Sequence, residues 1–407
     1  MRSRSPDNTH TSSRFLLRHL GTTALALAVL TGCASKPVQP KPDANKVKQF
    51  AGQGYLTDDH YSIATTFATW AIADSNFDVA LTLPAKQGSF PLVIYLPGLG
   101  ESRSAGEVWR TAWAQGGYAV LVVQPLEEDA AAWSSAQARS GDFAALARDR
   151  YSANSMTKRL NVLRQVMDEL LRRLASKEVP DRIDTSHIAI AGYDLGAYAA
   201  MVIAGETMRG FVKPALPMPI SAVIALSPYA SFSGMAFTER YSAIRVPVLS
   251  VTSNDDSDSL GVVNSPSLRQ APFEYMPSGD KYLLTMSDIP HSMMSGNKAK
   301  PDDNEKKSFA EKGGHGGDGN SQGKGKGHHG THHKSNGDSD STGTPGGGDM
   351  ASGVYLSPTS QAMSGVAIQG VMVAFLDAFV KNDPMAREWL GKDAPRWLGK
   401  KGGIKIR

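Results

Sequence analysis

The fold of this chain is decided by the stretch GYDLG, residues 192–196. The apolar run HIAIA (187–191) precedes it and predicts a short buried strand, while the small residues AYAAM (197–201) follow it and predict a helix. A turn this tight leaves no room for side chains at its two glycines. The sequence therefore predicts a strand, a sharp turn and a helix, with Asp194 presented at the apex of the turn.

Short apolar runs on both sides of this turn predict further strands, separated by segments with helical spacing of apolar residues. An early antiparallel pair and a series of buried strands are expected over residues 61–70, 77–83, 92–96, 119–124, 187–191, 222–226, 248–252 and 282–286. Helices are expected over residues 156–174 and 361–381. Strands that alternate with helices predict an α/β fold with a mostly parallel, doubly wound sheet.

A histidine able to work with the residue at the apex can be found by elimination. The other histidines lie in the N-terminal leader, in a glycine-rich insertion or at the start of predicted strands. His291 follows the last predicted strand, and in sheets that carry such a turn the residues come in the chain order nucleophile, acid, histidine. We therefore expect Asp194 and His291 to be catalytic residues.

The acid of this set is expected directly after the strand 248–252, where the sequence NDDSD contains three aspartates. Asp255 lies closest to the end of the strand and is the predicted acid, while Asp256 and Asp258 remain alternatives. A carboxylate at this place would orient the imidazole of His291 and stabilise its charged form.

Two backbone N–H groups are expected to form an oxyanion hole. One belongs to Leu195, which follows Asp194, and the other belongs to the loop PGLG (97–100) after the strand 92–96. Leu99 is the predicted donor in that loop, where the glycines allow a close approach of the backbone. We expect no cofactor and no metal at this site.

These motifs make the chain similar to α/β hydrolases of the dienelactone hydrolase and platelet-activating-factor acetylhydrolase-like group. The resemblance rests on YLPGLG (95–100), on residues 192–196 and on the stretch 271–282 that leads to His291. It implies an α/β-hydrolase fold without a large cap domain and a substrate that is a small ester or lactone. The chain departs from this group at Asp194, where Ser or Cys is typical, and at Pro97, where His is common.

Haloalkane dehalogenases and epoxide hydrolases share this fold and use an aspartate, which displaces a leaving group from carbon and forms an ester that water then hydrolyses. Those enzymes usually carry Trp where this chain has Leu195, and a cap for which residues 226–248 leave no room. Three interpretations therefore remain open. They are a hydrolase acting on a small ester, lactone or halogenated carbon, a catalytically inactive binding protein, and a metal-handling surface protein.

The N-terminus is typical of a bacterial lipoprotein, with a basic region, a short apolar stretch and the sequence LTGC (30–33), which resembles a lipobox. We expect residues 1–32 to be a signal peptide, Cys33 to be lipidated and residues 33–47 to be a tether. Because Ala34 rather than Asp follows the cysteine, the resemblance implies the outer membrane, with the protein facing the periplasm. The lipid would anchor the chain to its membrane partner.

The rest of the chain divides into a hydrolase domain over residues 48–296 and 351–399, an insertion over residues 297–350 and a basic tail over residues 400–407. The insertion is rich in Gly, Lys, Asp, Ser and His, and we expect it to be disordered. Its histidines could bind transition metals weakly. The formal net charge is only +4 and no nucleic-acid motif is present, so the expected partners are a small-molecule substrate and the membrane, but no nucleic acid.

Overall fold

The computed structural model describes residues 40–57, 60–231, 234–258, 260–263, 265–287, 289–298 and 357–407. The predicted signal peptide, Cys33 and nearly all of the predicted insertion lie outside these residues. The expectations for them stay predictions.

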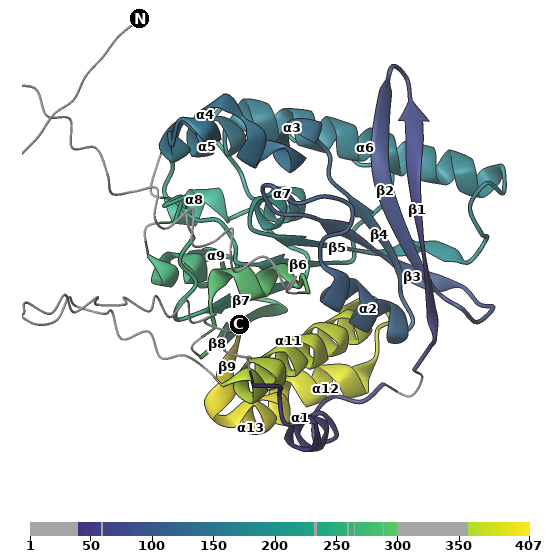
Figure 1. Ribbon diagram of the computed structural model, residues 1–407, viewed down its shortest axis with the longest axis vertical. Coiled ribbons are helices and arrows are strands. Elements are labelled where there is room, and N and C mark those ends of the chain that lie inside the picture. Colours follow the sequence, from purple (N-terminus) through teal and green to yellow (C-terminus); the bar gives the residue numbers. More distant parts are fainter. Residues whose placement is uncertain are drawn as a thin grey trace, which may run out of the picture. The chain divides into compact units, whose positions relative to one another are not determined.

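In the described part of the chain, one sheet contains nine strands in the order β1-β2-β4-β3-β5-β6-β7-β8-β9 (Figure 1). The strands from β4 to β8 in this order are parallel, β1 and β2 are antiparallel additions at one edge, and β9 is an antiparallel addition at the other. The predicted α/β class with a mostly parallel sheet is therefore confirmed. The strand bounds are β1 (Ile63–Ile72), β2 (Ser75–Pro84), β3 (Phe90–Leu96), β4 (Ala119–Val123), β5 (Ile183–Tyr193), β6 (Ala222–Leu226), β7 (Val248–Ser253), β8 (Lys281–Met286) and β9 (Gly402–Ile406).

Both faces of the sheet are covered by helices, as its nearly continuous apolar strands require. In β3, Leu92 and Ile94 belong to the core on one face, with α6 (Ala153–Ala175) and α7 (Leu195–Ala204). Val93 and Tyr95 belong to the core on the other face, with α2 (Glu107–Gln115) and α11 (Pro358–Phe379) (Figure 1). The two-residue alternation of a strand thus divides one apolar run between two cores.

The chain changes its direction of travel across the sheet between β3 and β5. From β3 it passes through α2 to β4 on one side, and it later returns to β5 on the other side of β3. The helices that follow β3 and β5, α2 and α7, therefore leave the carboxyl ends of these two strands toward opposite faces of the sheet. Ligand sites of open α/β sheets lie at such a point.

Every strand predicted from the sequence is present, and the predicted helices correspond to α6 and α11. Two predictions for the ends of the domain are wrong. Residues 400–407, expected to be a basic tail outside the hydrolase domain, contribute β9, which pairs with β8 through residues such as Ile404 and Ile406. The expected tether already contains the start of α1 (Ala44–Ala51), where Phe50 stacks on Trp397 at 4.8 Å between ring centroids.

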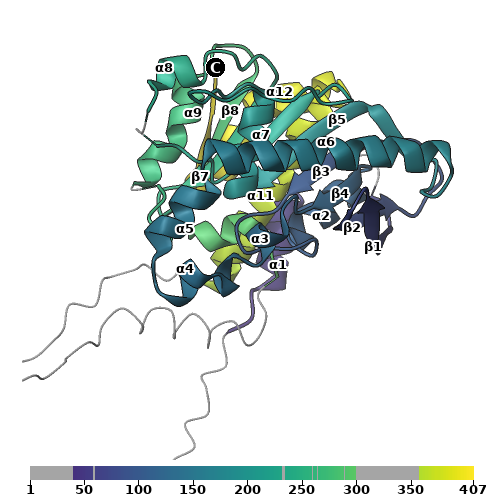
Figure 2. The same cartoon turned by 90° about the horizontal axis from the view of Figure 1, so that it is seen from above.

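The remaining helices are short. Between β6 and β7 the described residues contain only α8 (Phe237–Arg240), so this connection contains no large cap. Three helices lie together between β4 and α6 (Figure 2), namely α3 (Glu127–Ala130), α4 (Ala136–Arg139) and α5 (Phe143–Arg150). The others are α9 (Ala271–Tyr275), α12 (Pro384–Lys392) and α13 (Ala394–Leu398).

Helix α11 is the one helix in the described residues that is long and apolar enough to cross a membrane. However, 67% of its most apolar window is buried inside the protein, where it covers one face of the sheet. Its apolar character is thus explained by core packing.

Candidate active site

Asp194 stands between β5 and α7 with an unusual backbone conformation. Its φ is +51° and its ψ is −109°. A residue other than glycine at such a φ costs on the order of 1–3 kcal/mol, and this strain is concentrated at functional sites. The side chain is 9% exposed. The predicted strand, sharp turn and helix are all present, with Asp194 at the apex.

The two glycines of this turn are required by close contacts. A Cβ atom on Gly192 would lie 2.2 Å from the carbonyl oxygen of Gly196, and a Cβ atom on Gly196 would lie 1.9 Å from the carbonyl oxygen of Leu96. Side chains at these positions would push α7 away from β5 and from the end of β3. The glycines therefore keep the apex of the turn close to the loop that follows β3.

His291 pairs with a buried aspartate, and this aspartate is Asp256. The His291 Nδ1 lies 2.6 Å from Asp256 Oδ1, and the Asp256 side chain is fully buried. The prediction of Asp255 is corrected here, because Asp255 is exposed and its N–H binds Ser253 Oγ at 3.2 Å. The turn after β7 directs the first aspartate outward and the second toward His291. Asp258, the other alternative, accepts the loop N–H groups of Leu260, Val262 and Val263.

Asp256 is surrounded by donors that favour its charged form. It accepts hydrogen bonds from Thr252 Oγ1 at 2.7 Å and Ser227 Oγ at 2.9 Å, and Arg269 Nε lies 3.1 Å from Oδ1. Burial acts to raise the pKa of Asp256, but the bond from His291 and the Arg269 charge outweigh it and leave the pKa below its usual value. A carboxylate on Nδ1 keeps the proton there and leaves Nε2 as a base.

Asp194 is held by a residue that the sequence did not single out. The hydroxyl of Tyr151 donates to Asp194 Oδ1 at 2.8 Å. Burial, followed by the charge of Asp194, raises the pKa of Tyr151 well above its usual value, so that this phenol stays a donor. No hydrogen bond joins Asp194 to His291 within the described residues. The structure therefore pairs His291 with Asp256 and Asp194 with Tyr151, and no sequence motif marks Tyr151.

Both predicted oxyanion donors have an N–H group without an acceptor in the described part of the chain. Leu195 is the first residue of α7, and Leu99 lies between two residues whose N–H groups are bound. Gly98 N–H donates to Glu101 Oε2 at 2.8 Å, and Gly100 N–H donates to the Asp129 carbonyl at 2.8 Å. These neighbouring bonds fix the loop and leave Leu99 N–H free to bind a developing negative charge.

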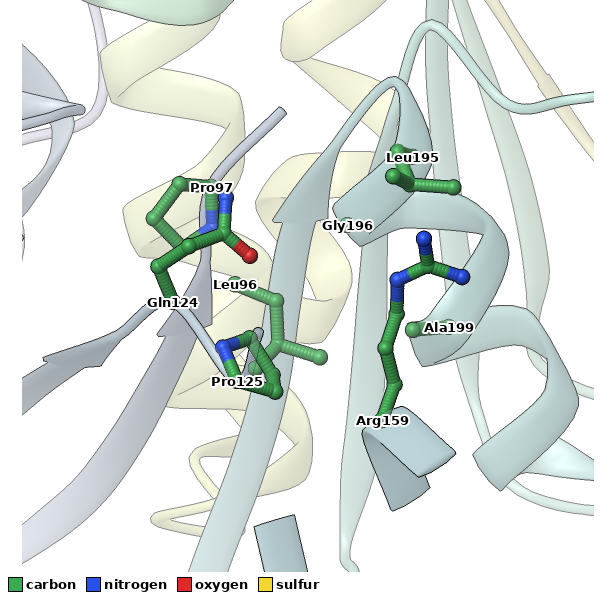
Figure 3. Close-up of a pocket in the computed structure, with 8 residues that line it drawn as sticks. All are labelled: Leu96, Pro97, Gln124, Pro125, Arg159, Leu195, Gly196 and Ala199. Atoms are coloured by element: carbon green, nitrogen blue, oxygen red, sulfur yellow. The ribbon is translucent and has the colours of Figure 1, made fainter. Parts of the chain in front are cut away.

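The loop after β3 is anchored from α6. Arg159 binds Asp129 through Nε at 2.6 Å and Nη2 at 2.8 Å, and both side chains are buried. Figure 3 shows the Arg159 guanidinium directed toward Leu195 from the helix below, beside a cavity of about 10 Å³. This volume is about that of one water molecule, so the cavity is too small for a substrate.

Glu101 is a third carboxylate at the site, beside Asp194 and Asp256. Its Oε1 accepts from Asn297 Nδ2 at 2.6 Å and its Oε2 accepts from Gly98 N–H. Burial raises the pKa of Glu101 to about 7, and the nearby charge of Asp194 acts in the same direction. The site thus contains an acid that titrates near neutral pH. The sequence gives no signal that separates this glutamate from other loop acids.

A larger cavity of about 880 Å³ lies at the opposite end of the sheet, where Phe90 begins β3. Its walls include Tyr55, Asp377 and Trp389. This cavity is remote from Asp194. The place with room for a ligand therefore differs from the place where the reactive side chains gather. Within the described residues, no three His, Cys, Asp or Glu side chains form a group that could hold a metal.

No protein-family model and no curated protein matches this chain. The geometry of the site is therefore the basis for a proposed function.

Proposed function

We propose that this protein is a hydrolase of the α/β-hydrolase fold in which Asp194 is the nucleophile, His291 the base and Asp256 the acid that orients it. The substrate is a small ester, a lactone or a halogenated carbon. The observation that carries this proposal is the strained φ of +51° at Asp194, at the carboxyl end of β5. Such strain is retained where it presents a reactive side chain.

The contacts of the site support a two-step reaction. Tyr151 binds Asp194 Oδ1, which leaves Oδ2 to attack the substrate. On a halogenated carbon, Oδ2 displaces the halide, which departs with the electron pair of its bond to carbon, and an ester of Asp194 forms. On an ester or lactone, Oδ2 attacks the acyl carbon, the alkoxide departs and is protonated, and an anhydride of Asp194 forms. In both cases His291 Nε2 then takes a proton from water, and the hydroxide attacks the carbonyl carbon of Asp194. The N–H groups of Leu195 and Leu99 stabilise the negative oxygen, and collapse of this intermediate restores Asp194 and releases an alcohol from the ester or an acid from the anhydride.

A catalytically inactive binding protein is a second candidate, and one contact favours it. The hydrogen bond from Tyr151 reduces the electron density on Asp194, and in the described residues His291 makes no bond to Asp194. A carboxylate in this state could bind a polar ligand without forming a covalent bond.

Labelling with heavy oxygen tests the two candidates. The chain beginning after Cys33 is incubated in H₂¹⁸O with short p-nitrophenyl esters, haloalkanes or epoxides, and the peptide containing Asp194 is analysed by mass spectrometry. Turnover with ¹⁸O in Asp194 supports the proposed reaction, because water attacks the Asp194 carbonyl. The His291→Ala variant should instead accumulate the ester on Asp194.

The control is Asp194→Ser, which tests the machinery around the nucleophile. If only this variant hydrolyses p-nitrophenyl esters, the base and oxyanion donors are competent and the natural protein is not an esterase. If neither protein turns over any of these substrates, the binding protein becomes the better description.

We also propose that the protein is lipid-anchored in the bacterial cell envelope through Cys33. The support is the sequence LTGC at residues 30–33. A Cys33→Ala variant should leave the membrane fraction. If this variant fractionates with membranes as the natural chain does, the anchor is elsewhere.

A further inference from the structure

The segment that carries α3, α4 and α5 also carries two exposed aromatic side chains. Trp133 is 47% exposed and Phe143 is 39% exposed. Their ring centroids are 6.4 Å apart with an interplanar angle of 65°, an edge-to-face arrangement. We call this pair the aromatic lip. Adjacent exposed aromatic rings mark binding surfaces more often than single ones.

The aromatic lip is packed against the loop that contains the oxyanion donor. The Trp133 indole lies so close to Gly100 that a Cβ atom on this glycine would be 1.8 Å from Nε1. The carbonyl oxygen of Asp129, in the same segment, accepts the Gly100 N–H, and Arg159 of α6 binds the Asp129 side chain. Trp133 is thus held beside Leu99 by a chain of buried contacts.

The other end of this segment reaches the nucleophile. The segment passes through α5 and ends at Tyr151, whose hydroxyl binds Asp194. A reacting carbon between Asp194 and the Leu99 N–H would therefore be bordered by residues of one segment. Trp133, which contacts Gly100 next to Leu99, and its neighbour Phe143 are the exposed large apolar side chains of that segment.

We propose that the aromatic lip is a substrate subsite that binds an aromatic ring or a branched hydrocarbon group next to the reacting carbon. The inference rests on the proposed function, because the location of the reacting carbon follows from Asp194. An apolar group gains affinity by removing these rings from water, and an aromatic group gains more by stacking. The preferred substrates would then have a bulky apolar group on one side of the bond that breaks.

The test measures binding, which does not require turnover. Ligand-observed NMR on the full chain compares 4-phenylbutyramide with acetamide, which lacks the ring. The Trp133→Ala variant should weaken binding of the phenyl amide about tenfold, and Phe143→Ala about threefold, because covering half of an aromatic side chain contributes affinity of this order. Trp133→Phe, which keeps a ring, should retain most of the binding.

The matched control is Tyr275→Ala. Tyr275 is 44% exposed at the end of α9, shortly before β8 begins at Lys281, and the parallel strands begin at the end of the sheet opposite Asp194. Removing it should change nothing, and acetamide should bind all variants equally. The subsite is overturned if Trp133→Ala and Phe143→Ala bind the phenyl amide as the natural chain does, or if the natural chain does not prefer it to acetamide.

The two proposals can fail separately. If the protein binds the phenyl amide through its ring but turns over no ester, haloalkane or epoxide, the proposed subsite is supported and the proposed hydrolase activity is rejected. If the protein turns over substrate and Trp133→Ala leaves the ratio of kcat/KM between phenyl and methyl substrates unchanged, the proposed hydrolase activity is supported and the proposed subsite is rejected.

Discussion

Two histidine–aspartate pairs in this protein have the same bond length and very different surroundings. His187 Nδ1 lies 2.6 Å from Asp184 Oδ2, and His291 Nδ1 lies 2.6 Å from Asp256 Oδ1. In the first pair the side chains are 46% and 25% exposed, and in the second they are 15% and 0% exposed. The first lies at the start of β5, and the second lies at the carboxyl ends of the strands.

The difference lies in what surrounds each carboxylate. Asp184 accepts from Ser186, a neighbour in the chain, and remains partly exposed to water. Asp256 is enclosed by Thr252, Ser227 and Arg269, which come from three separate parts of the chain. An exposed pair contributes about 0–1 kcal/mol, whereas a buried network is costly to break. A short bond alone therefore does not indicate a functional histidine, and enclosure by distant residues is the better sign.

The largest expected difference between the two pairs is the free energy of unfolding that is lost when the aspartate of each pair is removed. Asp256→Ala leaves the buried hydroxyls of Thr252 and Ser227 without their acceptor and buried Arg269 without one of its two carboxylate partners, and it should lower the free energy of unfolding by about 3–5 kcal/mol. Asp184→Ala should lower it by less than about 1 kcal/mol. Urea unfolding of both variants measures the difference, with Asp256→Asn as the control that keeps the shape. Equal losses would show that burial does not distinguish the pairs.

The histidines should differ in turnover rather than in stability. Once a substrate is found, His291→Ala should reduce the rate by about 10²–10⁴-fold, because it removes the general base. His187→Ala should leave the rate unchanged, since it lies at the opposite end of β5. Steady-state kinetics on both variants measure this. A loss of rate in His187→Ala would contradict the assignment of the site.

Glu101, in the loop after β3, and Asp184, at the start of β5, should make the free energy of unfolding depend on pH with opposite signs. The folded pKa of Glu101 is raised to about 7, so its contribution to stability is present below its unfolded pKa and is lost as the pH rises through 7. Burial acts to raise the pKa of Asp184, but bonds from Ser186 and His187 leave it lowered, so its contribution is lost only as the pH falls into the acid range.

Unfolding by urea from pH 5 to pH 8 tests this difference. Between pH 5 and pH 8 the natural chain should lose on the order of 1–3 kcal/mol of its free energy of unfolding, because Glu101 ionises. The Glu101→Gln variant should not show this loss. Asp184→Asn should leave the curve unchanged between these pH values. An unchanged curve for Glu101→Gln would mean that Glu101 is already ionised at pH 5.

The smallest effect is expected at Tyr151. Tyr151→Phe removes one hydrogen bond to Asp194 and should change stability by about 1 kcal/mol. If Asp194 is a nucleophile, the free oxygen becomes less well oriented and the rate should fall about tenfold, with KM little changed. A rate that rises in Tyr151→Phe would indicate that this tyrosine restrains Asp194, as in an inactive binding protein.

The sequence located the elements and the turn because these depend on neighbouring residues. Apolar alternation marks strands, and the two glycines around Asp194 mark the sharp turn. The edge strand β9 was not predicted, because its sequence is basic and rich in glycine and its order comes from pairing with β8. Local pattern carries no information about such a distant partner.

By itself, the sequence determined that a mostly parallel α/β sheet would present Asp194 at a turn, with His291 after the last parallel strand. Only the tertiary structure decided that Asp256 rather than Asp255 faces His291, that Tyr151 holds Asp194 and that burial raises the pKa of Glu101. The physical reason is that strand periodicity and glycine conformations act over a few residues. Hydrogen bonds and desolvation act between residues that folding brings together from distant parts of the chain.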